Sequence, residues 1–179
     1  MKYKVGEIGK VIGGGTPSTK HEEYYTSSGK GIAWLTPKDL SSYSKMYIDH
    51  GSRDLTSEGY NNSSAKLLPK DSVLISSRAP IGYVAIAKNE IATNQGFKSI
   101  IPDKSKVYPE YLYYLMLENK LNLEKVASGS TFKEVSGKVM KEFEVEIPSL
   151  SKQEKILNQL IPIQRKIELN NQINDNLAA

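Results

Sequence analysis

Three charged residues have the types and the order needed to hold a divalent cation. Asp103 is followed, at a spacing seen in nucleases, by Glu118 and Lys120, and paired carboxylates with a lysine can hold Mg²⁺ and activate water. That chemistry needs the glutamate and the lysine on a strand beside the aspartate, whereas the residues around them predict a helix. A Mg²⁺-dependent nuclease is therefore an alternative interpretation and not the preferred one.

Other catalytic and metal-binding patterns are weaker still. The stretch from Gly13 to Lys20 lacks the Gly-Lys-Ser/Thr ending of a phosphate-binding loop, so we interpret it as a turn or a loop that contacts backbone. No Asn/Asp-Pro-Pro-Tyr/Phe segment is present to hold an adenine amino group, which argues against an independent methyltransferase. Without Cys, thiolate zinc sites and disulfides are excluded. His21 and His50 lie in polar surroundings typical of exposed imidazoles, with DNA phosphate contact as the alternative.

Length and charge set broad limits. The 179 residues carry 24 Lys and Arg against 20 Asp and Glu, a formal net charge of +4. This excess permits a polyanionic partner without requiring one, so nucleic-acid binding would depend on local arrangement. No run approaches the roughly 18 apolar residues of a membrane span, and no secretory signal is recognisable. We expect one domain with an extra element, in the cytoplasm and without membrane association.

Residues 1–150 have the pattern of a mixed, loop-rich α/β domain. Short apolar runs bounded by Gly, Pro, Ser or Asp predict strands at 32–35, 73–75, 83–87 and 143–147. Pro109 and the helical spacing of the apolar residues after it predict a helix that ends before Ser128. The polar stretch 39–66 is predicted to form extended loops, and its tyrosines are weak candidates for DNA contact: Tyr43, Tyr47 and Tyr60.

Residues 151–179 predict one long helix. Ser151 and Glu154 form a candidate capping box at its start. Beyond them, residues at heptad spacing form a seam whose second half is polar: Ile156, Leu160, Ile163, Ile167, Asn170, Asn174 and Leu177. A helix over 151–177 would be about 40 Å long. The predicted fold class is α+β, with a mixed α/β domain followed by a projecting helix that forms an antiparallel helical pair; a surface helix of the same domain is the alternative.

Several short segments, taken in their order along the chain, also resemble the pattern of one protein family. They are residues 14–18, 32–40, 67–69, 73–82, 92–97, 127–132, 147–153 and 166–174. Together they resemble one half of a type I restriction-modification specificity subunit, that is, a target recognition domain followed by its spacer helix. The resemblance covers nearly the whole chain.

The resemblance implies a subunit that performs no chemistry and directs partner methyltransferase and restriction subunits to double-stranded DNA. It implies no cofactor on this chain, because the methyltransferase brings S-adenosylmethionine and flips out the adenine. The chain has one recognition domain and one helix, where a complete subunit of the family has two of each. It would be either a natural half-subunit or the N-terminal half of a longer chain. A homodimer would read an interrupted palindrome. A regulator that binds a specificity subunit without touching DNA is a further alternative.

Candidate DNA-binding residues are polar or cationic side chains at strand ends and Gly-flanked turns. Arg78 suits bidentate bonds to guanine, or else it pins its loop or pairs with a carboxylate. Asn94, Gln95 and Lys98 suit adenine or backbone contacts, with a turn role as the alternative for the two amides. Ser130, Thr131 and Lys133 follow Gly129 at a predicted helix start, where phosphate binding and capping are equally supported.

The remaining candidates depend only on charge and loop position. Lys20, Lys38 and Lys45 are predicted phosphate contacts, with solvated surface as the alternative for each. Trp34 and Phe97 are predicted to be core residues and not groups on which bases stack.

Overall fold

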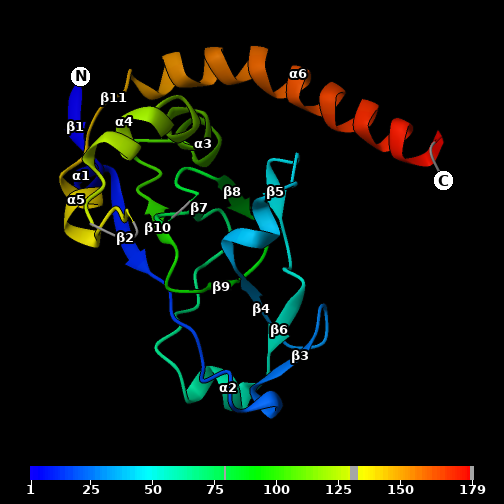
Figure 1. Ribbon diagram of the computed structural model, residues 1–179. Helices are drawn as coiled ribbons and strands as arrows, with labels where there is room; N and C mark the ends of the chain where they lie inside the picture. The colour runs from blue at the N-terminus through cyan, green and yellow to red at the C-terminus, as the bar shows by residue number, and fades with distance from the viewer. Residues whose placement is uncertain (79, 130–132, 178–179) are drawn as a thin grey trace.

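The computed structural model describes residues 1–78, 80–129 and 133–177. It confirms an α+β fold, in which two larger sheets, a two-stranded sheet and a group of helices are followed by the long helix α6 (Leu150–Leu177) (Figure 1). The short strands β1 (Lys2–Lys4) and β11 (Glu144–Glu146) pair antiparallel and join the first residues of the chain to the segment just before α6.

The larger sheet has five strands. Its order is β2 (Gly9–Gly13), β10 (Lys98–Pro102), β7 (Val73–Ile75), β8 (Val84–Ala87) and β5 (Tyr47–Ile48). All neighbours are antiparallel except β5 and β8. Alternate side chains of a strand point to opposite faces, so Val73 and Ile75 join one apolar cluster and Leu74 joins another. The sheet is therefore covered on both faces.

Helices cover the first of these faces. They are α1 (Val5–Ile8), α3 (Pro109–Glu118), α4 (Lys120–Val126) and α5 (Gly137–Glu142). The predicted helix begins at Pro109 as expected, but it is two helices. Asn119 separates them: its side chain donates to the carbonyl of Leu115 at 2.9 Å and so caps the end of α3. The chain then restarts in α4.

The smaller sheet has four strands. Its order is β3 (Tyr25–Ser27), β6 (Arg53–Leu55), β4 (Ile32–Leu35) and β9 (Ala92–Thr93), and the β4–β9 pair is parallel. Around it lie α2 (Ser57–Asn61) and two 3₁₀ turns, η1 (Glu22–Tyr24) and η2 (Pro37–Leu40). Trp34 and Phe97 are 2% and 0% exposed, which confirms both as core residues.

The stretch 39–66 is more ordered than its polar composition predicted, since it contains β5, β6 and α2. Its three tyrosines face inward. The Tyr43 hydroxyl donates to the carbonyl of Tyr47, the Tyr47 hydroxyl donates to Glu110, and the Tyr60 hydroxyl accepts from the Leu67 N–H at 3.2 Å. Burial, with a smaller contribution from the carboxylates of Asp49 and Glu168, raises the pKa of Tyr43 to about 12. These hydroxyls connect segments of the fold, and the DNA contact predicted for the three tyrosines stays a prediction.

The start of α6 differs from the predicted capping box. The helix begins at Leu150, and the carbonyl of Ser149 accepts from the N–H groups of Lys152 and Gln153, both at 2.9 Å. Because the helix already begins at Leu150, Ser151 lies inside its first turn and is not the residue that precedes it. Of the residues that the structure describes, none belongs to a helix of the length and apolar character that a membrane crossing needs.

In Figure 1, α6 passes over α3 and toward the β5 side of the domain, and its C-terminal end extends past the other elements. Gln153 and Leu157 are buried against it. Further along, Glu168 accepts from the Met46 N–H at 2.8 Å, and the Asn171 amide donates to Ser44 Oγ at 3.3 Å. The long C-terminal helix is present as predicted, and in addition a polar face of it finds partners in the segment before β5, so it also contacts the domain along part of its length.

The predicted seam follows a different side of α6. Along it, the first two residues are half-buried and the others are exposed: Ile156 and Leu160, then Ile163, Ile167, Asn170, Asn174 and Leu177. Ile163 and Ile167 are 57% and 48% exposed, which is high for large apolar side chains. Packing on the domain therefore leaves this apolar stripe uncovered.

Candidate nucleic-acid interface

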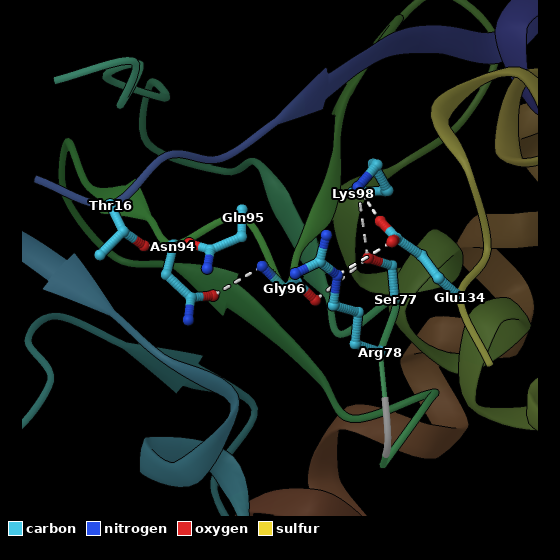
Figure 2. Close-up of polar contacts among 8 residues, drawn as sticks. All are labelled: Thr16, Ser77, Arg78, Asn94, Gln95, Gly96, Lys98 and Glu134. Carbon is cyan, nitrogen blue, oxygen red and sulfur yellow. Dashed lines mark hydrogen bonds and ion pairs between the residues drawn. The ribbon is translucent and has the colours of Figure 1, made fainter. Parts of the chain in front are cut away.

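Four separate segments place polar side chains and one polar backbone segment in a row, which we call the polar strip (Figure 2). Its members come from the turn after β2, the segment after β7, the β9–β10 connection with the start of β10, and the segment before α5. They are Thr16, Ser77, Arg78, Asn94, Gln95, Gly96, Lys98 and Glu134. The centre is fixed by Ser77, whose N–H and hydroxyl both donate to the carbonyl of Gly96, at 2.7 and 3.1 Å.

Glycines allow the turn after β2 to approach the β9–β10 connection. A Cβ on Gly14 would lie 2.1 Å from the carbonyl oxygen of Asn94, closer than any side chain could be placed. The Gly15 N–H donates to the carbonyl of Thr93 at 2.8 Å, and the Gly15 carbonyl accepts from the Trp34 indole at 3.1 Å. The Gly-rich stretch is therefore a backbone-contact loop, as expected, and it positions Thr16 beside Gln95.

At the other end of the polar strip, one carboxylate binds two cations. Arg78 Nε and Lys98 Nζ each lie 2.9 Å from an oxygen of Glu134. Their side chains are 45% and 14% exposed, and that of Glu134 is 29% exposed. Burial alone would raise the pKa of Glu134, but the hydrogen bonds from Lys98 and Arg78 outweigh burial and lower it. Arg78 thus pairs with a carboxylate, which was the alternative to its predicted base contact.

The two amides of the polar strip differ in their use. Asn94 Oδ1 accepts from the Gly96 N–H at 2.9 Å, an arrangement that closes the turn, so Asn94 has the structural role given as its alternative. Gln95 is exposed, and its amide oxygen accepts from the Thr16 hydroxyl. Because this contact uses only the amide oxygen, the NH₂ group of Gln95 can donate hydrogen bonds at this surface.

From Lys133 onward, the described chain enters a helix only at Gly137, later than the helix start predicted after Gly129. The next helix, α5, starts at Gly137, and the Ser136 hydroxyl caps it by accepting from the Val139 N–H at 3.2 Å. Before it, Glu134 forms β-bridges with Ser128 and Arg78. Lys133 is exposed beside the polar strip. Ser130 and Thr131 lie outside the described residues.

The three other predicted lysines are exposed on separate elements. Lys20 precedes η1, Lys38 lies within η2, and Lys45 directly precedes Met46, which contacts α6. The structure does not place them among the eight residues of the polar strip. They are available to a large partner and form no compact site of their own.

Asp39 holds the turn that carries Lys38. Its carboxylate accepts from the Thr36 N–H and hydroxyl, at 2.7 and 2.8 Å, and from the Ser52 N–H at 2.9 Å. Burial alone would raise the pKa of Asp39, but these hydrogen bonds outweigh burial and hold it below the usual value of 3.8. The ionised carboxylate is therefore the form that the fold stabilises.

We expect Asp39→Asn to lower the free energy of unfolding by about 1 kcal/mol near pH 7. Because the folded pKa is depressed, the stabilisation is complete above the unfolded pKa of 3.8 and is lost as the pH falls through the folded pKa. Urea unfolding of both proteins at neutral and at acidic pH measures the difference. A gap that stays constant down to about pH 3 would contradict the role of the ionised form.

Comparison with known proteins identifies the family. Residues 1–179 match the type I restriction modification DNA specificity domain. The chain belongs to this family. It is 48% identical over 155 residues to the type I restriction enzyme MjaIX specificity subunit of Methanocaldococcus jannaschii, which covers 86% of this chain and 35% of that protein. It is 28% identical over 159 residues to the EcoR124I/EcoR124II specificity subunit of Escherichia coli, covering 86% of this chain and 38% of the relative.

Solved structures share the fold of this specificity domain. The HsdS subunit from Thermoanaerobacter tengcongensis aligns with a TM-score of 0.70 at 20% identity, covering 97% of this chain and 39% of that one. A chain from a study of assembly and conformational transition of the type I R-M system aligns with a TM-score of 0.75 at 20% identity, covering 99% and 41%. The specificity domain described here thus spans well under half of the length of these relatives.

The nuclease pattern finds no support in the specificity domain. Glu118 is the last residue of α3 and Lys120 the first of α4, so neither lies on a strand. The Asp103 carboxylate accepts from the N–H and hydroxyl of Ser105, at 3.0 and 2.6 Å. Within residues 1–78, 80–129 and 133–177, no three His, Asp or Glu side chains gather as metal ligands would.

Two residues of the specificity domain escaped the sequence reasoning. Sequence reasoning missed Glu134 because its role is to pair with two cations, Arg78 and Lys98, that are distant from it in sequence. Arg53 is exposed on β6 with its guanidinium 3.9 Å from the ring centre of Tyr25 and 5.4 Å from that of Trp34. No alternation in the sequence marks this strand, because Arg53 is exposed while both Asp54 and Leu55 are buried. His50, expected to be exposed, is half-buried and pairs with Asp54 at 3.0 Å.

Proposed function

We propose that this chain recognises a DNA sequence for a type I restriction-modification enzyme. In this proposal it performs no chemistry, acts in the cytoplasm, and positions methyltransferase and restriction subunits on double-stranded DNA. The observation that carries the proposal is the match of residues 1–179 to the DNA specificity family. S-adenosylmethionine would be bound by the methyltransferase, and this chain would need no cofactor.

The polar strip supports a division of labour in DNA contact. Gln95 offers an amide donor suited to base edges, and Arg78 retains guanidinium N–H groups beyond the Nε that binds Glu134. Lys98 and the exposed Lys133 suit phosphate oxygens, as do the lysines outside the strip. Arg53 adds an exposed cation on a neighbouring sheet. We therefore propose that Gln95 and the remaining N–H groups of Arg78 read base edges, while Arg78 Nε, Lys98 and the outlying cations hold the duplex through its phosphates.

The exposed stripe of α6 supports association with a second copy. Antiparallel pairing along residues 156–177 would cover Ile163 and Ile167, and the seam residues Asn170 and Asn174 would favour one register. Two identical domains related by a two-fold axis would read an interrupted palindrome. A helix of about 40 Å against a DNA turn of about 34 to 36 Å sets the half-sites roughly one turn apart.

Selection from random duplexes tests the proposal. The chain is incubated with the methyltransferase of the same system and a duplex library, and bound DNA is sequenced over successive rounds. We expect enrichment of a two-part palindrome whose halves are separated by about one helical turn. In the same assay, Gln95→Ala should relax the preference at single positions and leave the spacing unchanged. If no sequence is enriched, the recognition function fails and a regulator that binds only another specificity chain takes its place.

A further inference from the structure

Glu134 occupies the position of an anion within the polar strip. One of its carboxylate oxygens binds Arg78 Nε and the other binds Lys98 Nζ, both at 2.9 Å (Figure 2). Lys98 also reaches Ser77 Oγ at 3.5 Å. This pair of donors, a guanidinium and an ammonium, is one that binds phosphate oxygens equally well.

The backbone around Glu134 is held without its side chain. The N–H and carbonyl of Glu134 bond to the carbonyl and N–H of Ser128, at 2.9 and 3.1 Å, and the Val135 N–H donates to the carbonyl of Ser77 at 2.9 Å. Val135 is fully buried and anchors the segment from the next position. The carboxylate is therefore not needed to fix this segment, and its placement against two cations calls for another explanation.

We propose that Glu134 stands in for a DNA phosphate and lowers the affinity of the chain for non-specific DNA. This inference depends on the proposed function, because it concerns the same polar strip. A duplex that approaches the strip meets two cations already neutralised in part by a carboxylate. A phosphate can bind Arg78 and Lys98 only by displacing Glu134, against charge repulsion. A cognate site offers base contacts that favour this exchange, whereas a random site offers none.

The proposal has a signature in salt dependence. Each phosphate that a cation neutralises steepens the fall of log K with log salt by about 0.9. With the carboxylate in place, Arg78 and Lys98 contribute little to binding of random DNA. Without it, both become available, and the slope should steepen by up to about 2. A role that is only structural would change stability and leave this slope unchanged.

The experiment compares Glu134→Gln with a matched control. Glu154→Gln makes the same change of charge at an exposed position on α6, away from the polar strip. Binding of the full chain to a labelled duplex of random sequence is measured by fluorescence anisotropy as KCl is raised from about 50 to about 200 mM. We expect Glu134→Gln to bind about tenfold more tightly at the lowest salt, with the steeper slope, and Glu154→Gln to match the wild type.

A second variant separates the two cations. Adding Arg78→Gln to the Glu134→Gln chain should remove about half of the gain in slope, because one freed cation is lost. Equal slopes for wild type and Glu134→Gln, with both chains folded and bound to DNA, would overturn the inference and leave the proposed function intact. If neither chain binds any duplex, alone or with the methyltransferase, the proposed function fails and the inference fails with it.

Discussion

Replacing both Ile163 and Ile167 by aspartate is expected to make the chain monomeric and to weaken binding of its two-part target by at least about a hundredfold. Both side chains are exposed on a single chain, so the substitutions should not unfold the domain. In a paired helix they would place four carboxylates in an apolar seam, where uncompensated charge is strongly unfavourable. The loss in DNA binding follows because two linked recognition domains gain about 10² to 10⁴ in affinity over one.

Sedimentation equilibrium and anisotropy with the selected duplex measure the two effects. The matched control is Asn158→Asp with Gln172→Asp, which adds the same charge at exposed positions on the opposite side of α6. This control should stay dimeric and should bind with affinity close to that of the wild type. An unchanged mass for the Ile163 and Ile167 variant would show that the seam is not the interface between two copies.

Features set by local sequence were predictable. The runs 32–35 and 73–75 are strands because short apolar segments bounded by polar and turn residues favour extended structure. Pro109 begins a helix because its fixed backbone suits the first turn. Likewise Trp34 and Phe97 are core residues, as large apolar side chains at such positions usually are.

Features set by tertiary contacts were not predictable in this way. A carboxylate partner was one of the predicted alternatives for Arg78. Which carboxylate it is, Glu134, depends on how two distant segments meet. The break between α3 and α4 at Asn119 could not be predicted from periodicity, because the apolar spacing continues across it. The seam of α6 was identified from its spacing alone. Which other face of that helix packs on the domain depends on the polar segment 44–46, whose backbone groups attract Gln164 and Glu168.

Gln153 is the clearest case of a residue whose role only the fold reveals. It is fully buried in the first turn of α6. Its amide nitrogen donates to the carbonyls of Lys106 and Pro148, at 2.8 and 3.0 Å, and its amide oxygen accepts from the Tyr108 N–H at 3.1 Å. One side chain thus satisfies three backbone groups from two segments and fixes the first turn of the helix.

Gln153→Ala should therefore lower the free energy of unfolding by about 3 kcal/mol, because it leaves buried backbone groups without partners. Gln164→Ala is the control: its amide reaches Ser44 and Glu168 at a more exposed place, so a loss below about 1 kcal/mol is expected. Urea unfolding measures both. With the first turn of α6 loosened, the selected target should also tolerate a wider range of spacings between its halves. If both variants lost the same free energy of unfolding, the hydrogen bonds of Gln153 would contribute little. Leu157 and the contacts near Met46 would then be what holds the helix in place.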